Sequence, residues 1–141
     1  MFVVANCDDG FFSDAHNQCI SLPSLGSGCS VIADVIIALD ASGSVGSLNF
    51  ERVRAFAKRF AEQFVVRSNA VRVAVVTFAS RVTVEFEFDS NGNRIQRNID
   101  AILYRGGSTR TDLALETAMS LFEEKAGNLN RVDAFVSCGD H

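Results

Sequence analysis

Apolar residues form short continuous runs and longer periodic stretches over residues 29–141. Residues 35–39 and 71–79 are almost wholly apolar, as is typical of parallel strands that are covered on both faces. Residues 81–88 alternate between apolar and polar side chains, which favours a strand with one face in water. Because this stretch follows directly after Ser80, we expect it to turn back antiparallel as the edge of a sheet. Residues 131–138 predict a fourth strand.

Three stretches have apolar residues at helical spacing. In the first, residues 47–65, Ser47 is a candidate N-cap. The apolar positions are Phe50, Val53, Ala57, Phe60 and Phe64 in the first stretch, Ile95, Ile99, Ile102 and Leu103 in the second, and Leu115, Ala118, Met119 and Phe122 in the third. Strands and helices therefore follow one another in the order β α β β α α β. This order predicts an α/β fold: a doubly wound, mostly parallel, Rossmann-like sheet with one antiparallel edge strand.

The chain is expected to divide near residue 28. Residues 1–28 contain the only proline and show no helix or strand pattern, so we interpret them as a small Cys-rich segment and linker. Residues 29–141 form the sheet domain. No helix pattern follows its fourth strand, which predicts a bare flank of the sheet and a domain that is incomplete at its C-terminal side.

Charge and hydropathy argue against two classes of partner. The formal net charge is −4, and the arginines and lysines form no basic stripe that could neutralise a nucleic acid backbone. No apolar stretch approaches the ~20 residues that cross a bilayer. We therefore expect no nucleic acid partner and no membrane span in this chain.

The four cysteines indicate an oxidising environment. Cys7, Cys19, Cys29 and Cys138 form no C-x-x-C pair, and the two histidines add no zinc-like spacing. Three of them lie within the first 29 residues, as in small secreted modules that are held by disulfides. We expect Cys7 to pair with Cys19, because Cys29 precedes the first strand of the sheet domain and Cys138 ends a parallel one. The protein is expected to be extracellular or secreted, or to be the ectodomain of a larger protein.

The loop after the first apolar run carries three oxygen side chains. Asp40, Ser42 and Ser44 alternate around Gly43, so a turn brings a carboxylate and two hydroxyls to one point. Ligands of open parallel sheets bind beyond the carboxyl ends of the strands, and an oxygen-only set suits Mg²⁺. The alternative is structural: Ser44 or Ser47 caps the helix and Asp40 favours its positive end.

Residues 29–141 closely resemble the von Willebrand factor type A domain. The resemblance rests on DVIIALDASGSVGSLNFERVRAFAKRF, VRVAVVTFASRVTVEFEF and IDAILYRGGSTRTDLALETAMSLF, and it weakens in the last few residues. It implies a metal-ion-dependent adhesion site in which Asp40, Ser42 and Ser44 form the first segment and Thr109 supplies the threonine. Thr111 is a weaker candidate, because a role as N-cap of the helix that starts at Leu113 explains it better. The resemblance also implies Mg²⁺, or Mn²⁺, and a partner carboxylate that completes the shell.

The final strand departs from the family pattern. The family's Thr-Asp-Gly falls on Ser137, Cys138 and Gly139, so Cys138 stands where an aspartate belongs. Asp140 follows two residues later and is a weaker substitute, because such a shift moves a side chain by several ångströms. A thiol is too soft to replace a carboxylate at Mg²⁺, which predicts weakened metal affinity. The Cys138 thiol itself is either a buried structural group or an exposed reactive one.

We expect a non-catalytic function. A nucleophile at Ser44 would need a glycine where Ser42 stands, and no suitably placed histidine accompanies it in the sheet domain except the terminal His141. The resemblance implies an adhesion or matrix-type domain that recognises an acidic residue of an extracellular protein through Mg²⁺. The alternative is a metal-independent structural or assembly module whose metal site is disabled by Cys138.

Overall fold

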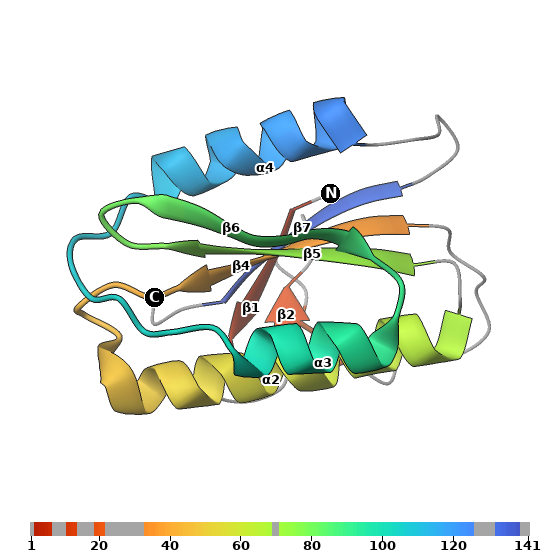
Figure 1. Ribbon diagram of the computed structural model, residues 1–141, viewed down its shortest axis with the longest axis horizontal. Coiled ribbons are helices and arrows are strands. Elements are labelled where there is room, and N and C mark those ends of the chain that lie inside the picture. Colours follow the sequence, from red (N-terminus) through yellow and green to blue (C-terminus); the bar gives the residue numbers. More distant parts are fainter. Residues whose placement is uncertain are drawn as a thin grey trace.

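The computed structural model has an open sheet with helices on both faces (Figure 1). It describes residues 2–6, 11–13, 19–21, 33–68, 71–125 and 132–138. The strands are β1 (Phe2–Asn6), β2 (Phe11–Ser13), β3 (Cys19–Ser21), β4 (Ala33–Asp40), β5 (Val71–Phe78), β6 (Val82–Asp89) and β7 (Val132–Cys138). The helices are α2 (Gly46–Ser68), α3 (Gly92–Asp100) and α4 (Thr111–Lys125). No helix in these ranges is long and apolar enough to cross a membrane.

The predicted α/β fold is confirmed. The sheet order is β3-β2-β1-β7-β4-β5-β6, with β4 parallel to both β5 and β7 and with β6 antiparallel at the edge. Helices α2 and α3 lie on one face of the sheet and α4 lies on the other (Figure 1). The carboxyl ends of β4, β5 and β7 therefore meet at one edge, on the left of Figure 1.

Strand β4 is buried on both faces, which explains its unbroken apolar run. Val35, Ile37 and Leu39 pack with α2 and α3, while Ile36 and Ala38 pack with α4. The face toward α2 and α3 holds the large aromatic side chains Phe50, Phe56 and Phe60 of α2. Burial of this kind stabilises a fold by about 25 cal/mol per Å² of apolar surface. The core therefore fixes β4 rigidly and holds the loop that follows it.

Two expectations for residues 1–28 and for β7 need correction. The absence of strands in residues 1–28 is wrong, since β1, β2 and β3 extend the sheet. The bare flank beside β7 is also wrong, because β1 pairs with β7 in parallel. A strand edge with unpaired backbone groups is unfavourable, and β1 pairs with the edge of β7. Phe2–Val4 have high β-propensity, but the polar residues that follow them hid this short strand pattern. The division of the chain at residue 28 stays a prediction.

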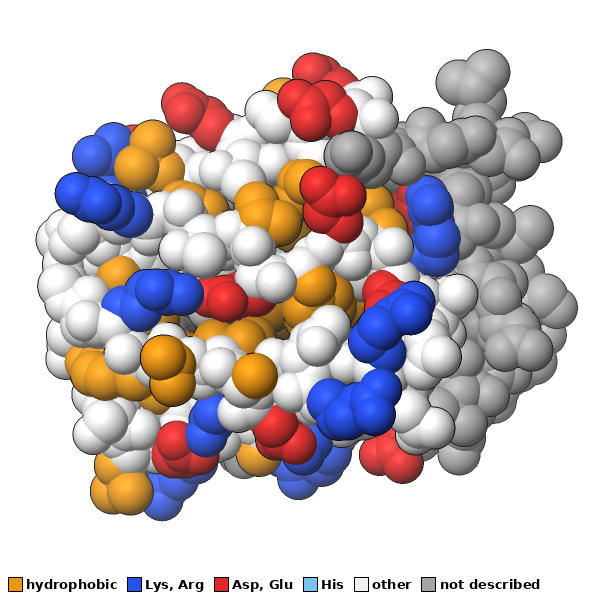
Figure 2. All heavy atoms as spheres, in the orientation of Figure 1, with side chains coloured by type: hydrophobic (Ala, Val, Ile, Leu, Met, Phe, Trp, Pro, Cys, Tyr) orange, Lys and Arg blue, Asp and Glu red, His pale blue; other side chains and the backbone are white. Residues whose placement is uncertain are grey.

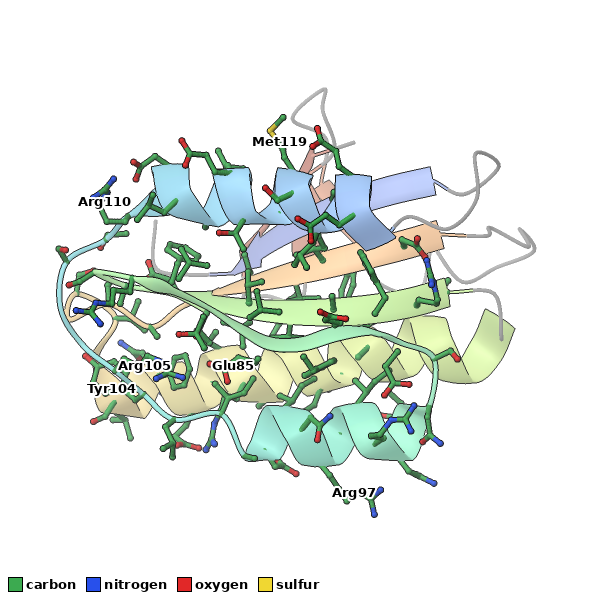
Figure 3. The ribbon with its side chains drawn as sticks, turned by 45° about the horizontal axis from the view of Figure 1, so that its top comes forward. Glu85, Arg97, Tyr104, Arg105, Arg110 and Met119 are labelled. Carbon is green, nitrogen blue, oxygen red and sulfur yellow. The ribbon has the colours of Figure 1, made fainter. Side chains whose placement is uncertain are left out.

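Several side chains differ from their predicted positions. Leu103 follows the end of α3 and is 71% exposed, and Met119 on α4 is 59% exposed and points away from the sheet in Figure 3. In β6 the expected alternation breaks, because register shifts opposite Val73–Val76 send Phe86 to the α2 face, while Phe88 packs on the α4 face. A bulge turns successive residues to the same face, which a strict two-residue period does not foresee.

Candidate functional site

The loop after β4 brings the first three predicted ligands together. Asp40 is the last residue of β4, where Phe78 of β5 is its strand neighbour, and it is only 2% exposed. Its Oδ1 atom accepts a hydrogen bond of 2.9 Å from the backbone N–H of Ser42. The Oγ atoms of Ser42 and Ser44 lie 3.0 Å apart. A carboxylate and two hydroxyls thus share one turn, as the alternating pattern predicts.

A second loop, residues 101–110 between α3 and α4, is fastened against the first. The Gly43 N–H donates to the Gly107 carbonyl at 2.8 Å, and the Gly106 N–H donates to the Ala41 carbonyl at 2.9 Å. The Tyr104 hydroxyl donates to the Ser42 carbonyl at 3.2 Å. These bonds join segments that are more than sixty residues apart in sequence. They therefore set how the 101–110 loop faces the Asp40 turn.

Gly107 shows why glycine is required where the loops meet. Its φ of +96° is one that other residues adopt only with strain, and a Cβ atom there would stand 2.4 Å from the Ser80 Oγ atom. The Ser80 hydroxyl instead accepts a hydrogen bond of 2.9 Å from the Ser108 N–H. The turn after β5 is therefore the third segment of the site, and sequence reasoning missed the role of Ser80.

Thr109 and Cys138 lie in segments whose backbones adjoin the Asp40 turn. Thr109 is exposed and follows Gly107 by two residues, and among the described residues its side chain makes no hydrogen bond to Asp40, Ser42 or Ser44. Cys138 ends β7 as the strand neighbour of Leu39, one residue before Asp40. Asp140 and Cys7 lie outside the described residues, so the predicted substitution by Asp140 and the Cys7–Cys19 disulfide stay predictions.

The helix-capping alternatives can be compared with the observed boundaries. Helix α2 begins at Gly46 and α4 begins at Thr111, so Ser47 and Thr111 lie inside the first turns of their helices. Ser47 is exposed, and Ser44 lies in the turn before α2 with its hydroxyl against that of Ser42. The prediction that Ser47 is the N-cap of α2 is therefore wrong, because Ser47 lies inside the helix. The side chain of Ser44 belongs to the Asp40 turn.

Asp40 lacks a counter-charge in the described part of the chain. It forms no ion pair there, although buried carboxylates are costly unless they are paired or bind a metal. Across the described residues, no three His, Cys, Asp or Glu side chains gather at one point. The oxygen set is thus one carboxylate and nearby hydroxyls, which fits a hard cation that keeps several waters.

Charges of both signs are mixed on the surface, and the absence of a nucleic acid partner stays a prediction. Figure 2 shows acidic and basic side chains interspersed over this face, with apolar side chains between them. Several described arginines on the loops and helices pair with an acidic side chain, as in the Arg105–Glu85 pair of 2.8 Å and the Arg110–Asp112 pair of 2.6 Å. A single-sign stripe of the kind that binds a phosphate backbone is not seen on the face shown in Figure 2.

A family model covers most of the chain. Residues 34–137 match the von Willebrand factor type A domain, and the chain belongs to this family. Among similar proteins, von Willebrand factor A domain-containing protein 1 of Bos taurus is 40% identical over 67% of this chain and 24% of its own length. The collagen alpha-1(VI) chain of Gallus gallus is 34% identical over 67% of this chain and 10% of its own length.

Solved structures show the same fold. Proximal thread matrix protein 1 from the mussel byssus superposes with a TM-score of 0.71 at 24% identity, over 79% of this chain and 31% of that one. The vWF domain of the pilus tip protein Mfa5 from Porphyromonas gingivalis gives 0.63 at 23% identity, over 77% of this chain and 37% of that one. The chain thus spans between a tenth and a quarter of the length of the two relatives named above.

Proposed function

We propose that this domain binds an acidic residue of an extracellular partner protein through Mg²⁺ held at Asp40, Ser42, Ser44 and Thr109. The family assignment and the relatives in matrix proteins support a protein-interaction domain in an extracellular context. Such domains in matrix proteins are generally non-enzymatic, which agrees with a recognition role. The finer claims concern the metal and the acidic ligand.

The observation that carries the proposal is the buried carboxylate of Asp40. It stands at the carboxyl edge of the sheet with two hydroxyls beside it and no arginine or lysine paired to it among the described residues. A cation would compensate this charge, and Mg²⁺ or Mn²⁺ prefers such oxygen ligands. A bound Mg²⁺ would supply an open coordination position for a carboxylate of the partner.

One observation favours a second candidate function. Cys138 ends β7 beside the strand that carries Asp40, and the family resemblance implies an aspartate at its position. Replacing a carboxylate by a thiol removes a negative charge and a hard ligand from the site. If this loss is decisive, the domain is a metal-independent structural or assembly module. The two functions differ in whether Mg²⁺ changes the protein at all.

Thermal unfolding of the full chain in saturating Mg²⁺ and in excess EDTA tests the proposal. A ligand at a hundred times its Kd adds about 2.7 kcal/mol to the free energy of unfolding, which raises the midpoint by several degrees. We expect the wild-type midpoint to rise in Mg²⁺ and that of the Ser42→Ala/Ser44→Ala variant to stay unchanged. A matched Ser120→Ala variant on the exposed face of α4 should respond like wild type.

The Cys138→Asp variant separates the two functions. A stronger Mg²⁺ response in this variant, on top of a clear wild-type response, supports a weakened but competent site. A response in Cys138→Asp alone means that the wild-type site is disabled and that the structural module is correct. Once the metal response is known, partner fragments can be compared with their Asp→Asn and Glu→Gln versions to test recognition of an acidic residue.

A further inference from the structure

The 101–110 loop carries Thr109 and has no regular secondary structure, so its position depends on side-chain anchors. At its start, the Arg54 guanidinium of α2 donates to the carbonyls of Asp100 and Ile102 at 2.8 and 2.9 Å. At its end, the Arg110 N–H donates to the Ala79 carbonyl at 3.0 Å. Between these points the loop reaches the Asp40 turn. An anchor in the middle of the loop would therefore control the site most directly.

Glu85 is such an anchor, and it comes from the edge strand β6. Its Oε1 atom accepts two hydrogen bonds, one of 2.7 Å from the Thr77 hydroxyl and one of 2.8 Å from the Arg105 guanidinium. Thr77 is 1% exposed and lies one residue before the strand neighbour of Asp40. Figure 3 shows Glu85 facing Arg105 and Tyr104 where the loop passes β6. The Glu85 carboxylate thus links Arg105 of the loop to Thr77 in the core of the sheet.

A bulge in β6 lies at Glu85. Val84 pairs with Val76, but Phe86 pairs with Val75, so Glu85 is the extra residue between two pairs. In a regular register Glu85 itself would pair with Val75, on the face that Thr77 shares, and the bulge brings Phe86 to that position instead. Glu85 keeps the face of Thr77, where it accepts a hydrogen bond from the Thr77 hydroxyl, and bulges are frequent beside functional sites.

We propose that Glu85 and Arg105 are positioning residues of the cation site. The pair holds the 101–110 loop so that Gly106 and Gly107 remain bonded to the Asp40 turn and Thr109 stays beside it. This inference rests on the proposed Mg²⁺-dependent function. Its physical basis is preorganisation, because a loop that must be ordered on binding costs conformational entropy that a fixed loop does not.

A matched control pair lies at the C-terminal end of β6. Asp89 pairs with Arg94 of α3, and the side chains of Asp89 and Glu85 are 11% and 15% exposed. The two carboxylates thus lie on the same strand and are buried to a similar degree, and each pairs with its own arginine. Arg94 lies in the first turn of α3, away from the Asp40 turn. Loss of Arg94 should therefore report the general cost of breaking such a pair.

Tyr104 provides a direct probe of the loop. It is the single tyrosine, the chain has no tryptophan, and its hydroxyl donates to the Ser42 carbonyl at 3.2 Å. Tyrosine fluorescence of the full chain therefore reports on the contact between the 101–110 loop and the Asp40 turn. The experiment measures Mg²⁺ titrations by fluorescence and by melting midpoint, and acrylamide quenching in EDTA, for wild type, Arg105→Ala, Arg94→Ala and Arg105→Lys.

For Arg105→Ala we expect about a tenfold higher Mg²⁺ concentration at half-saturation, the size of one lost charge-assisted hydrogen bond. Acrylamide quenching in EDTA should rise, while the EDTA melting midpoint stays within a degree or so of that of Arg94→Ala. Arg94→Ala should keep the wild-type Mg²⁺ affinity. Arg105→Lys should recover part of the loss, because it keeps the charge without the planar fork.

Two results would overturn this inference and leave the proposed function standing. One is a wild-type Mg²⁺ half-saturation and unchanged quenching in Arg105→Ala. The other is an equal loss in Arg105→Ala and Arg94→Ala, which would reduce the pair to general stability. If wild type itself shows no Mg²⁺ response by fluorescence or by melting, the proposed function fails and the positioning role fails with it.

Discussion

The two ends of β4 hold buried carboxylates in opposite situations. Asp34 at the amino end is 0% exposed and receives two hydrogen bonds from Arg72, of 2.8 and 2.5 Å. The Arg72 guanidinium also stacks over the Phe88 ring at 5.3 Å from its centroid. Asp40 at the carboxyl end is 2% exposed and receives a backbone N–H bond from Ser42. One carboxylate has its cation within the protein, and the other pairs with no arginine or lysine in the described ranges.

This difference separates a structural charge from a functional one. A buried ion pair fixes the arrangement of its strands, and removal of one partner is strongly destabilising. A buried carboxylate among hydroxyls destabilises the fold unless a cation arrives from solution. The ion pair at the amino end of β4 should therefore stabilise the fold in every buffer, whereas the carboxylate at the carboxyl end should destabilise it without a divalent cation and stabilise it when the cation is bound.

The largest expected effect is that of Asp34→Asn. The substitution removes the buried Asp34 charge from its ion pair with Arg72, so the free energy of unfolding should fall by about 3 kcal/mol, at the low end for a buried pair because Arg72 is partly exposed. Urea unfolding measures this loss, which should be equal in Mg²⁺ and in EDTA. The Asp34→Leu/Arg72→Met double variant should recover stability. If the loss of stability in Asp34→Asn depended on Mg²⁺, the two ends of β4 would not differ in the way described.

Gly107→Ala should come next, at about 2 kcal/mol, because it combines a strained φ with a contact of 2.4 Å between the new Cβ and the Ser80 hydroxyl. The companion Gly106→Ala, whose Cβ meets nothing closer than 3.8 Å, carries the φ strain without the clash. Urea unfolding in EDTA and the Mg²⁺-induced melting shift check both variants. Equal Mg²⁺ shifts in Gly107→Ala and wild type would show that the loop contact does not shape the site.

Asp40→Asn should have a smaller effect of opposite sign. In EDTA it removes an uncompensated buried charge while the amide oxygen still accepts from the Ser42 N–H, so the free energy of unfolding should rise by about 1 kcal/mol. In Mg²⁺ the variant should lose the cation's contribution and become less stable than wild type. Urea unfolding in EDTA and in Mg²⁺ checks whether the variant is more stable than wild type in the first condition and less stable in the second. A fall in EDTA comparable to that of Asp34→Asn would mean that Asp40 is structural.

The smallest effect concerns the exposed Arg110–Asp112 pair, which serves as a reference for the two buried carboxylates of β4. Hydrogen bonding to Arg110 lowers the pKa of Asp112 to about 2. A lowered pKa contributes stability above the unfolded value near 3.9, and this contribution is lost as the pH falls toward 2. A carboxyl NMR titration should find this pKa, and Arg110→Gln should return it toward 3.9. If the pKa of Asp112 in wild type is near 3.9, Arg110 does not stabilise the carboxylate and the pair cannot serve as a reference.

Much of the fold could be predicted because the sheet is covered on both faces. Apolar runs such as Val35–Leu39 have few alternatives once helices follow them, and the spacing of Phe50, Val53 and Phe60 identifies the buried face of α2. Pairing of β1 with β7 could not be predicted, because a short strand far away in sequence has no local signature. The bulge at Glu85 was missed because periodicity alone assumes a regular register.

The candidate site was predictable where its residues are adjacent in sequence. Asp40, Ser42 and Ser44 share one turn, so their spacing determines their proximity. Thr109 was assigned from a family resemblance, and the contacts that bring its loop to the turn come from Gly107, Ser80 and Tyr104. Such contacts join distant segments and leave no local pattern. Two consecutive glycines after an aromatic residue were the only sequence sign of a close approach there.

The role of Asp40 in cation binding can be measured by calorimetric titration of Mg²⁺ into wild type, Asp40→Asn and Asp34→Asn, each below its melting temperature. We expect one Mg²⁺ per chain for wild type, no binding for Asp40→Asn, and binding of wild-type affinity for Asp34→Asn. Binding that persists in Asp40→Asn, or wild-type protein that binds no Mg²⁺ and no Mn²⁺, would contradict this expectation.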